Sequence, residues 1–233
     1  MARKALEKVP PFRTAILYMV EIKNTLFDSS ERDRKAVKQM YLEHEDPFGF
    51  SRNLEQLRFQ RAMELLESVH PEMKFERALE IGCAEGMFTR TLAVRCESLL
   101  AVDLSEIAIE RAQRNCQDLL NVQFAEWDVR RDPVHGSFDL IVATGVLEYI
   151  LRPATLRDAL ERITAGLKPG GYLLLGNTVT DANVEKTWIG KKLIRGSLVN
   201  DLFAADPRYE TIESSLDQCV CLFAHVLLRK RTV

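Results

Sequence analysis

The sequence lacks a surplus of charge of either sign. Its 32 lysines and arginines are offset by 34 aspartates and glutamates, which leaves a net charge of −2. Proteins that bind nucleic acid or anionic membranes depend on an excess of basic residues. The one tight basic cluster near an end, Arg229–Arg231, is interpreted as a solvated terminus. We therefore expect neither nucleic acid nor a membrane surface as a partner.

The chain also has no long apolar run and no paired cysteines. The patch Ala15–Val20 is too short to cross a membrane, and no small-residue cleavage site follows it, so we expect no signal peptide. The five cysteines are an odd number without a C-x-x-C pair, which favours reduced thiols over disulfides. No spacing of His, Asp and Glu is typical of a metal site. We expect a cytoplasmic protein with metal-independent chemistry.

Short apolar segments alternate with helical patterns in residues 71–233. The expected strands are Arg77–Ile81, Ser98–Val102, Val122–Glu126, Phe138–Ala143 and Tyr172–Gly176. The expected helices between them include Thr89–Arg95, Glu106–Leu119 and Thr155–Leu167, the last ending at a tight turn, Lys168–Gly171. This alternation is typical of an α/β protein with a parallel sheet covered on both faces.

The two ends of the chain have different patterns. Helices are expected at Ser30–Glu43 and Asn53–Val69, which makes residues 1–70 a helical extension of the α/β domain. Asn183–Phe203 is expected to contain one or two helices. Two further strands, Tyr209–Leu216 and Val220–Arg229, are close enough in sequence to pair antiparallel. The parallel sheet should therefore end in an antiparallel edge.

Small residues gather where the first strand of the sheet ends. In "RALEIGCAEGMFTRTLA", Gly82, Ala84 and Gly86 lie between an apolar strand and a helix. Such a turn lets a ligand approach the backbone and the amino end of the helix. A dinucleotide fingerprint needs a third glycine where Met87 stands, so a ligand without a pyrophosphate is favoured. A purely structural turn remains the alternative.

Acidic residues follow the next two strands. Asp103 lies about twenty residues past the turn, where a carboxylate can accept hydrogen bonds from both hydroxyls of a ribose. Ser105 can cap the following helix, which leaves Asp103 available for a ligand. Asp128 can accept a hydrogen bond from an adenine amino group, and Trp127 offers a flat apolar wall. The alternative for Trp127 and Asp128 is a polar loop with a surface aromatic.

The segments "ALEIGCAEG", "LLAVDLS", "EWDV", "FDLIVATGVLEYI" and "LKPGGYLLLGN" together resemble the successive motifs of class I S-adenosylmethionine-dependent methyltransferases. The resemblance covers about Arg77 to Thr178. It implies a Rossmann-like, doubly wound seven-stranded sheet, mostly parallel with an antiparallel last strand. It implies S-adenosylmethionine as cofactor and S-adenosylhomocysteine as product.

The same resemblance implies roles for individual residues. Glu80 would lie near the methionine amino group, and Gly82, Ala84 and Gly86 would face the methionine and ribose, with Cys83 beside them. Asp103 would hold the ribose hydroxyls, Leu104 would lie against the adenine, and Asp128 would bind the adenine amino group. Val129 and Thr144 complete the expected cofactor site. The middle glycine of the motif is replaced by Ala84, whose methyl group is tolerable there.

A narrower resemblance concerns "MYLEHEDPFGF" and the helix that follows it, together with "LAVRCESLLAVDLS". These segments are similar to the NodS-type N-methyltransferases of small molecules and sugar amines. The likeness implies that Tyr41, Asp46 and Phe48 form an N-terminal lid over the cofactor. The alternative is a plain connector between two helices.

The expected reaction is in-line transfer of a methyl group to N or O of a small molecule, such as an amino sugar or a natural-product intermediate. The acceptor should lie beyond the fourth and fifth strands, with Glu148, Tyr149 and His44 as candidate catalytic residues. Glu148 could equally be an acid favoured in the first turn of a helix. His135, His225 and His70 are discounted.

The sequence fits three other functions less well than methyl transfer. A cofactor-binding regulator or subunit without transfer activity is the alternative, and a nicotinamide oxidoreductase is disfavoured by Met87. A nucleic-acid methyltransferase is disfavoured because "ATGVLEY" stands where an "NPPY"-type motif would be. We expect a monomer or a homodimer.

Overall fold

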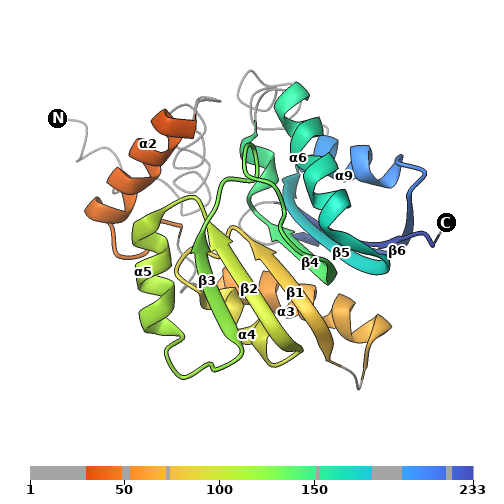
Figure 1. Ribbon diagram of the computed structural model, residues 1–233, viewed down its shortest axis with the longest axis horizontal. Helices are drawn as coiled ribbons and strands as arrows, with labels where there is room; N and C mark the ends of the chain where they lie inside the picture. The colour runs from red at the N-terminus through yellow and green to blue at the C-terminus, as the bar shows by residue number, and fades with distance from the viewer. Residues whose placement is uncertain are drawn as a thin grey trace.

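The computed structural model describes residues 30–48, 53–71, 74–150, 153–179, 196–218 and 222–232. Its centre is a seven-stranded sheet in the order β3-β2-β1-β4-β5-β7-β6 (Figure 1). The strands are β1 (Phe75–Ile81), β2 (Cys96–Asp103), β3 (Val122–Glu126), β4 (Phe138–Thr144), β5 (Leu167–Val179), β6 (Tyr209–Gln218) and β7 (Leu222–Lys230). Strand β7 runs antiparallel to both β5 and β6, and the other neighbouring pairs are parallel. The predicted fold class is confirmed.

Helices cover both faces of this sheet. They are α2 (Ser30–Glu43), α3 (Asn53–Val69), α4 (Met87–Ala93), α5 (Glu106–Asn115), the 3₁₀ helix η2 (Leu147–Tyr149), α6 (Pro153–Gly166) and α9 (Gly196–Ala204). In Figure 1, α6 and α9 lie over one face and α3 and α4 over the other. Two large apolar clusters fill the layers, one around Ile141, Ile163 and Phe203 and one around Phe59, Leu92 and Leu174. No helix among the described residues is both long and apolar enough to span a bilayer.

Several expected boundaries are corrected. Lys168–Gly171 is not a separate tight turn, because β5 already begins at Leu167. Gly170 has a φ of 77°, and the pairing of β4 with β5 shifts register between Phe138 and Leu140, so the strand accommodates the glycines as an irregularity. The helix expected to reach Leu119 ends at Asn115. Residues 183–195 of the expected helical segment lie outside the described residues.

The sheet order reverses around β1, which places the site. Strand β1 pairs with β2 on one side and β4 on the other, so Ile81 lies opposite both Val102 and Ala143. Ligands of open α/β sheets bind outside the carboxyl ends of the strands at such a switch point. The residues just after β1, β2, β3 and β4 are therefore brought to one edge of the sheet.

Candidate functional site

The turn after β1 has a strained backbone. Gly82 and Gly86 both have a φ of 80°, and Ala84 lies in the left-handed region with a φ of 47°. Gly82 N and Cys83 N both donate to the carbonyl oxygen of Val102, at 2.8 and 3.0 Å. The turn is thereby folded over the end of β2, where α4 begins at Met87.

Packing as well as backbone conformation requires the two glycines. A Cβ on Gly82 would lie 2.9 Å from the Val146 side chain, and one on Gly86 would lie 2.8 Å from Cys116 Sγ and 3.3 Å from Ala112 Cα. The turn is therefore pressed between α5 and the loop after β4. The sequence analysis explained the glycines by the close approach of a ligand. These packing contacts are a second reason why glycine is required at both positions.

We expect Gly86→Ala to lower the free energy of unfolding by about 1–3 kcal/mol, because it combines left-handed strain with overpacking. Urea unfolding followed by circular dichroism measures the loss. The double variant Gly86→Ala/Cys116→Ala should recover only the part of the lost free energy of unfolding that comes from overpacking. A single variant as stable as the parent would contradict the packing described here.

Asp103 connects the end of β2 to this turn. Its Oδ2 accepts from Ala84 N at 3.0 Å and its Oδ1 accepts from Ser105 N at 2.9 Å. Removal from water raises the pKa of Asp103, while the hydrogen bonds from these backbone groups oppose the rise. Ser105 is the N-cap of α5 and accepts from Ala108 N at 3.3 Å, as predicted. The half-buried carboxylate keeps lone pairs for further donors, and Leu104 beside it is also half-buried.

Asp128 is held by two arginines. The carboxylate is 2% exposed. Arg130 donates from Nε to Oδ1 at 2.8 Å and from Nη2 to Oδ2 at 3.0 Å, and Arg131 Nε lies 3.5 Å from Oδ2. A ligand amino group would thus share this carboxylate with Arg130, which the sequence analysis did not foresee. Val129, the next residue, is buried in the core.

Trp127 ties the loop after β3 to the end of β2. Its backbone N donates to the carbonyl oxygen of Asp103 at 2.9 Å. Its indole Nε1 donates to the carbonyl oxygen of Pro133 at 3.3 Å. The half-buried ring packs against the core, so the expected apolar wall is held from two sides.

Glu80 and Cys83 are buried beside the turn. Thr89 Oγ1 donates to Glu80 Oε2 at 2.7 Å, and burial raises the pKa of Glu80 to about 7. Burial also raises the pKa of the Cys83 thiol well above its usual value. Cys83 packs with Ala101 and Ile109, so its side chain belongs to the core under α5. Only the backbone of Cys83 is then suited to a ligand.

The end of α2 brings Tyr41 within electrostatic range of Asp103. Tyr41 is 1% exposed, and its hydroxyl has no hydrogen-bond partner among the described residues. Burial, followed by the charges of Asp103 and Glu85, raises the pKa of Tyr41 well above its usual value, so the hydroxyl remains a donor. Its ring meets Phe48 edge-on at 5.9 Å. His44 is exposed after the last turn of α2, and Asp46 is half-buried.

The expected acceptor region lies past β4 and β5. Thr144 ends β4 and is half-buried, and Gly145 N donates to the Gly176 carbonyl oxygen at 2.7 Å. Glu148, in η2, is 1% exposed, and its Oε2 accepts from Thr178 N. Tyr149 beside it is half-buried.

Two polar side chains that meet near this region come from β5 and α9. Asn177 Nδ2 donates to Asn200 Oδ1 at 2.8 Å, and both side chains are buried. Asn200 was not among the expected site residues. Its helix begins at Gly196, and sequence patterns do not show which side of such a short helix faces β5.

Arg58 is a cation that the sequence analysis missed. Its Nη2 lies 3.3 Å from the position that a Cβ on Gly145 would take, and its guanidinium lies over the Phe223 ring at 3.8 Å from the centroid. A positive charge is thereby present at the carboxyl end of β4. In sequence it is one of the two arginines of α3, and no pattern distinguishes it.

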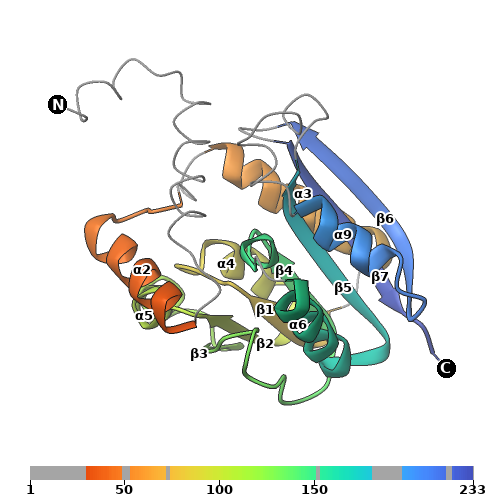
Figure 2. The same cartoon turned by 90° about the horizontal axis from the view of Figure 1, so that it is seen from above.

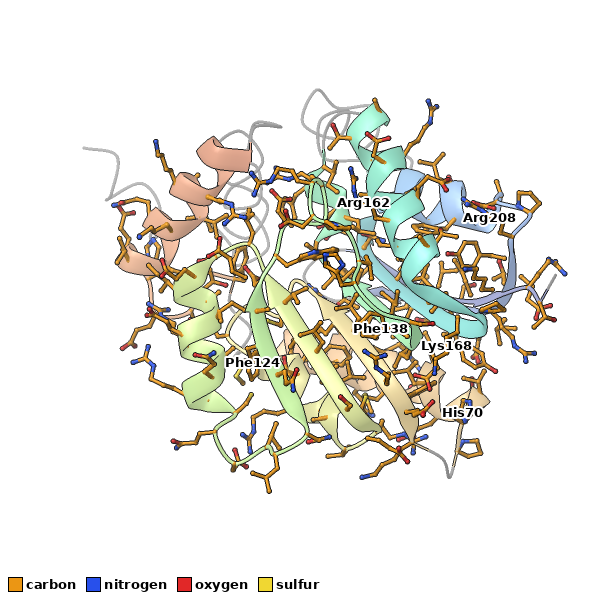
Figure 3. The ribbon with its side chains drawn as sticks, viewed as in Figure 1. His70, Phe124, Phe138, Arg162, Lys168 and Arg208 are labelled. Carbon is orange, nitrogen blue, oxygen red and sulfur yellow. The ribbon has the colours of Figure 1, made fainter. Side chains whose placement is uncertain are left out.

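Of the other three histidines, His135 and His70 lie away from this site, whereas His225 packs beside Gly176 and Thr144. His135 is exposed in the loop before β4, at the opposite end of that strand. His225 is fully buried in β7 and meets Phe223 edge-on at 4.9 Å. His70, which follows the end of α3, is half-buried and packs edge-on against Phe75 at 4.9 Å and Tyr172 at 5.6 Å. Figure 3 shows His70 with Lys168 at the edge opposite the carboxyl ends of the strands.

The fold and this edge define a class I S-adenosylmethionine-dependent methyltransferase. The strand order with its antiparallel β7, the turn at Gly82–Gly86 and the acidic residues at the carboxyl ends of β1, β2 and β3 occur together in one chain. The family model described as "Nodulation protein S (NodS)" matches residues 30–208. The chain belongs to the NodS family.

Individual relatives agree with this assignment. Nodulation protein S of Sinorhizobium fredii (strain NBRC 101917 / NGR234) is 32% identical over 163 residues, which span 67% of this chain and 74% of that protein. Nodulation protein S of Rhizobium tropici is 37% identical over 109 residues, 47% of this chain and 45% of that protein. The N-methyltransferase NodS from Bradyrhizobium japonicum WM9, solved with S-adenosyl-L-homocysteine, shares the fold with a TM-score of 0.73 and 24% identity, over 85% of this chain and 98% of that one.

Proposed function

We propose that the protein transfers a methyl group from S-adenosylmethionine to the amine nitrogen of a small molecule, with amino sugars as the favoured acceptors. The observation that carries this proposal is Glu148, a 1% exposed carboxylate at the acceptor side of the site. Its Oε2 accepts from Thr178 N, and the lone pairs of its second oxygen can accept from an acceptor amine. A buried carboxylate is stable only when it is paired, and an amine or ammonium is the matching partner.

The residues present fit the cofactor. Its methionine part carries an ammonium and a carboxylate, for which Glu80 and Arg58 offer opposite charges near the ends of β1 and β4. Asp103 would accept from the ribose hydroxyls and Asp128 from the adenine amino group. Tyr41, whose buried hydroxyl has no partner in the described part of the chain, would donate to the bound cofactor. Residues 1–70 would then serve as the lid of the domain formed by residues 71–233.

The cofactor supplies a methyl group that its sulfonium already activates. Glu148 would hold the acceptor amine, take its proton and align its lone pair for in-line attack. Tyr149 and His44 would close the site around the acceptor. Alignment of this kind accounts for about 7–11 kcal/mol of barrier lowering in well-oriented reactions. The chain's own residues thus have to orient the acceptor, exclude water and accept one proton.

Binding of the cofactor should depend on pH through Glu80. The pKa of about 7 in the free protein means that Glu80 is mostly protonated at lower pH, and the methionine ammonium binds the ionised form. Affinity should therefore rise with pH and be about eightfold tighter near pH 7.5 than near pH 6. Calorimetry with S-adenosylhomocysteine measures this change, and Glu80→Gln should flatten it. A parent protein with the same affinity at both pH values would contradict the role of Glu80.

A methyl-transfer assay tests the proposed function. The protein is incubated with methyl-labelled S-adenosylmethionine and matched pairs of amino sugars, one with a free amine and one N-acetylated. Transfer only to the free amine supports the proposal. Tight binding of S-adenosylhomocysteine with no transfer to any amine or hydroxyl acceptor would overturn it in favour of a regulatory protein.

A further inference from the structure

Arg111 of α5 contacts the end of α2 across the edge of the sheet. Its Nη1 donates to the carbonyl oxygens of His44 at 3.2 Å and Glu45 at 2.8 Å, and its Nη2 donates to the carbonyl oxygen of Tyr41. Its guanidinium also lies 5.4 Å from the centroid of the Tyr41 ring. Figure 2 shows α2 lying beside α5. One side chain thus makes four contacts with the segment that carries Tyr41.

The chemistry of these contacts favours a strong attachment. The last carbonyls of a helix have no partner within the helix and form its negative end. Helix α2 has no basic residue in its own last turn, and Arg111 donates to one carbonyl of that turn, Tyr41 O, and to the carbonyls of His44 and Glu45, which follow the helix. Hydrogen bonds from a guanidinium are charge-assisted and stronger than neutral ones. Another ion pair between α2 and the sheet, Arg34 with Glu126, is more exposed and contributes less.

Arg111 reaches the cofactor turn at the same time. Its Nη1 also donates to Glu85 Oε1 at 2.5 Å, and Glu85 is 8% exposed. The Glu85 carbonyl oxygen accepts from Asn115 Nδ2 at 2.9 Å, so the turn is tied twice to α5. Arg111 therefore connects the turn after β1 with the end of α2, the segment that carries Tyr41.

We propose that Arg111 is a positioning residue that holds the segment 41–45 over the cofactor site and thereby sets cofactor affinity through Tyr41. The proposal rests on the proposed function for the identity of the cofactor. Arg111 itself does not touch the ligand. Loss of Arg111 should release the end of α2 from the sheet, and the Tyr41 hydroxyl should then no longer be held in its buried position.

The test is binding of S-adenosylhomocysteine to Arg111→Met/Glu85→Gln. The second substitution removes the buried carboxylate that Arg111→Met alone would leave unpaired. We expect binding about tenfold weaker than in the parent, and faster hydrogen exchange in residues 30–48 with unchanged exchange in β1 and β2. Tyr41→Phe should weaken binding about three- to tenfold in the parent and less than twofold in this background.

The matched control is Arg114→Met, on the same helix. Arg114 is exposed, and within the described residues it donates only to the Glu110 carbonyl oxygen of its own helix, so both readouts should stay at the parent values. Parent-like binding of Arg111→Met/Glu85→Gln, or unchanged exchange in residues 30–48, would overturn the proposal. A parent protein that transfers no methyl group to any amine would refute the proposed function but leave both readouts of this test intact.

Discussion

The alanine variant of Asp103 is expected to bind S-adenosylmethionine and S-adenosylhomocysteine roughly 10²–10⁴-fold more weakly than the parent. Two hydrogen bonds from ribose hydroxyls to a carboxylate would be lost, each worth about 1.5–3 kcal/mol, and every 1.4 kcal/mol is about tenfold in affinity. Calorimetry with S-adenosylhomocysteine measures the loss.

A control variant must separate the loss of contacts between Asp103 and the ligand from a change in the conformation of the turn after β1. Asp103 also accepts from Ala84 N and Ser105 N, so alanine removes support from a strained backbone. Asp103→Asn keeps the size and one acceptor oxygen, so it can keep one of these two hydrogen bonds and should restore part of the stability but little of the affinity. Thermal unfolding of both variants by circular dichroism gives the comparison. A folded Asp103→Ala protein with parent affinity would refute the placement of the ribose.

The glutamine variant of Glu148 is expected to lower kcat by about 10²–10⁴-fold, the usual contribution of a general base. The affinity for S-adenosylmethionine should stay within twofold, because Glu148 is assigned to the acceptor side. Steady-state kinetics with an amine acceptor separates the two quantities.

A purely structural Glu148 makes a different prediction. The side-chain oxygen of glutamine can still accept from Thr178 N, as Glu148 Oε2 does in the parent. If anchoring η2 to β5 were the only role, Glu148→Gln would keep both its stability and its kcat. Tyr149→Phe in the same assay tests the neighbouring hydroxyl. Unchanged kcat in Glu148→Gln would remove Glu148 from the mechanism.

Local sequence patterns predicted those helices and strands whose bounds depend on residues close in sequence. The helices Ser30–Glu43 and Asn53–Val69 have the expected bounds because spaced apolar residues mark them and glycine or proline lies between them. The strand Val122–Glu126 also has the expected bounds. Strand β5 was predicted too short, because two glycines and a proline usually end a strand. Here the pairing of β5 with β4 continues across them with a shift of register.

The acidic residues of the candidate site could be predicted because their positions follow from the topology. A parallel sheet brings the carboxyl ends of its strands to one edge, so a carboxylate just after a strand has a known place. The surroundings of these carboxylates could not be predicted. Asp128 is paired with Arg130. Glu80 is buried, which raises its pKa to about 7, and it accepts a hydrogen bond from Thr89, which opposes the rise.

The amino-acid order alone indicated the class of this protein through an alternating α/β chain, a glycine turn that favours a ligand without a pyrophosphate, and carboxylates at the ends of the first three strands. These features depend on neighbours a few residues apart. Only the tertiary structure brought Arg58 to the end of β4, joined Asn177 to Asn200 and placed Arg111 on carbonyl groups 66–70 residues away. Contacts of that range depend on how helices pack on the sheet, which no local pattern encodes.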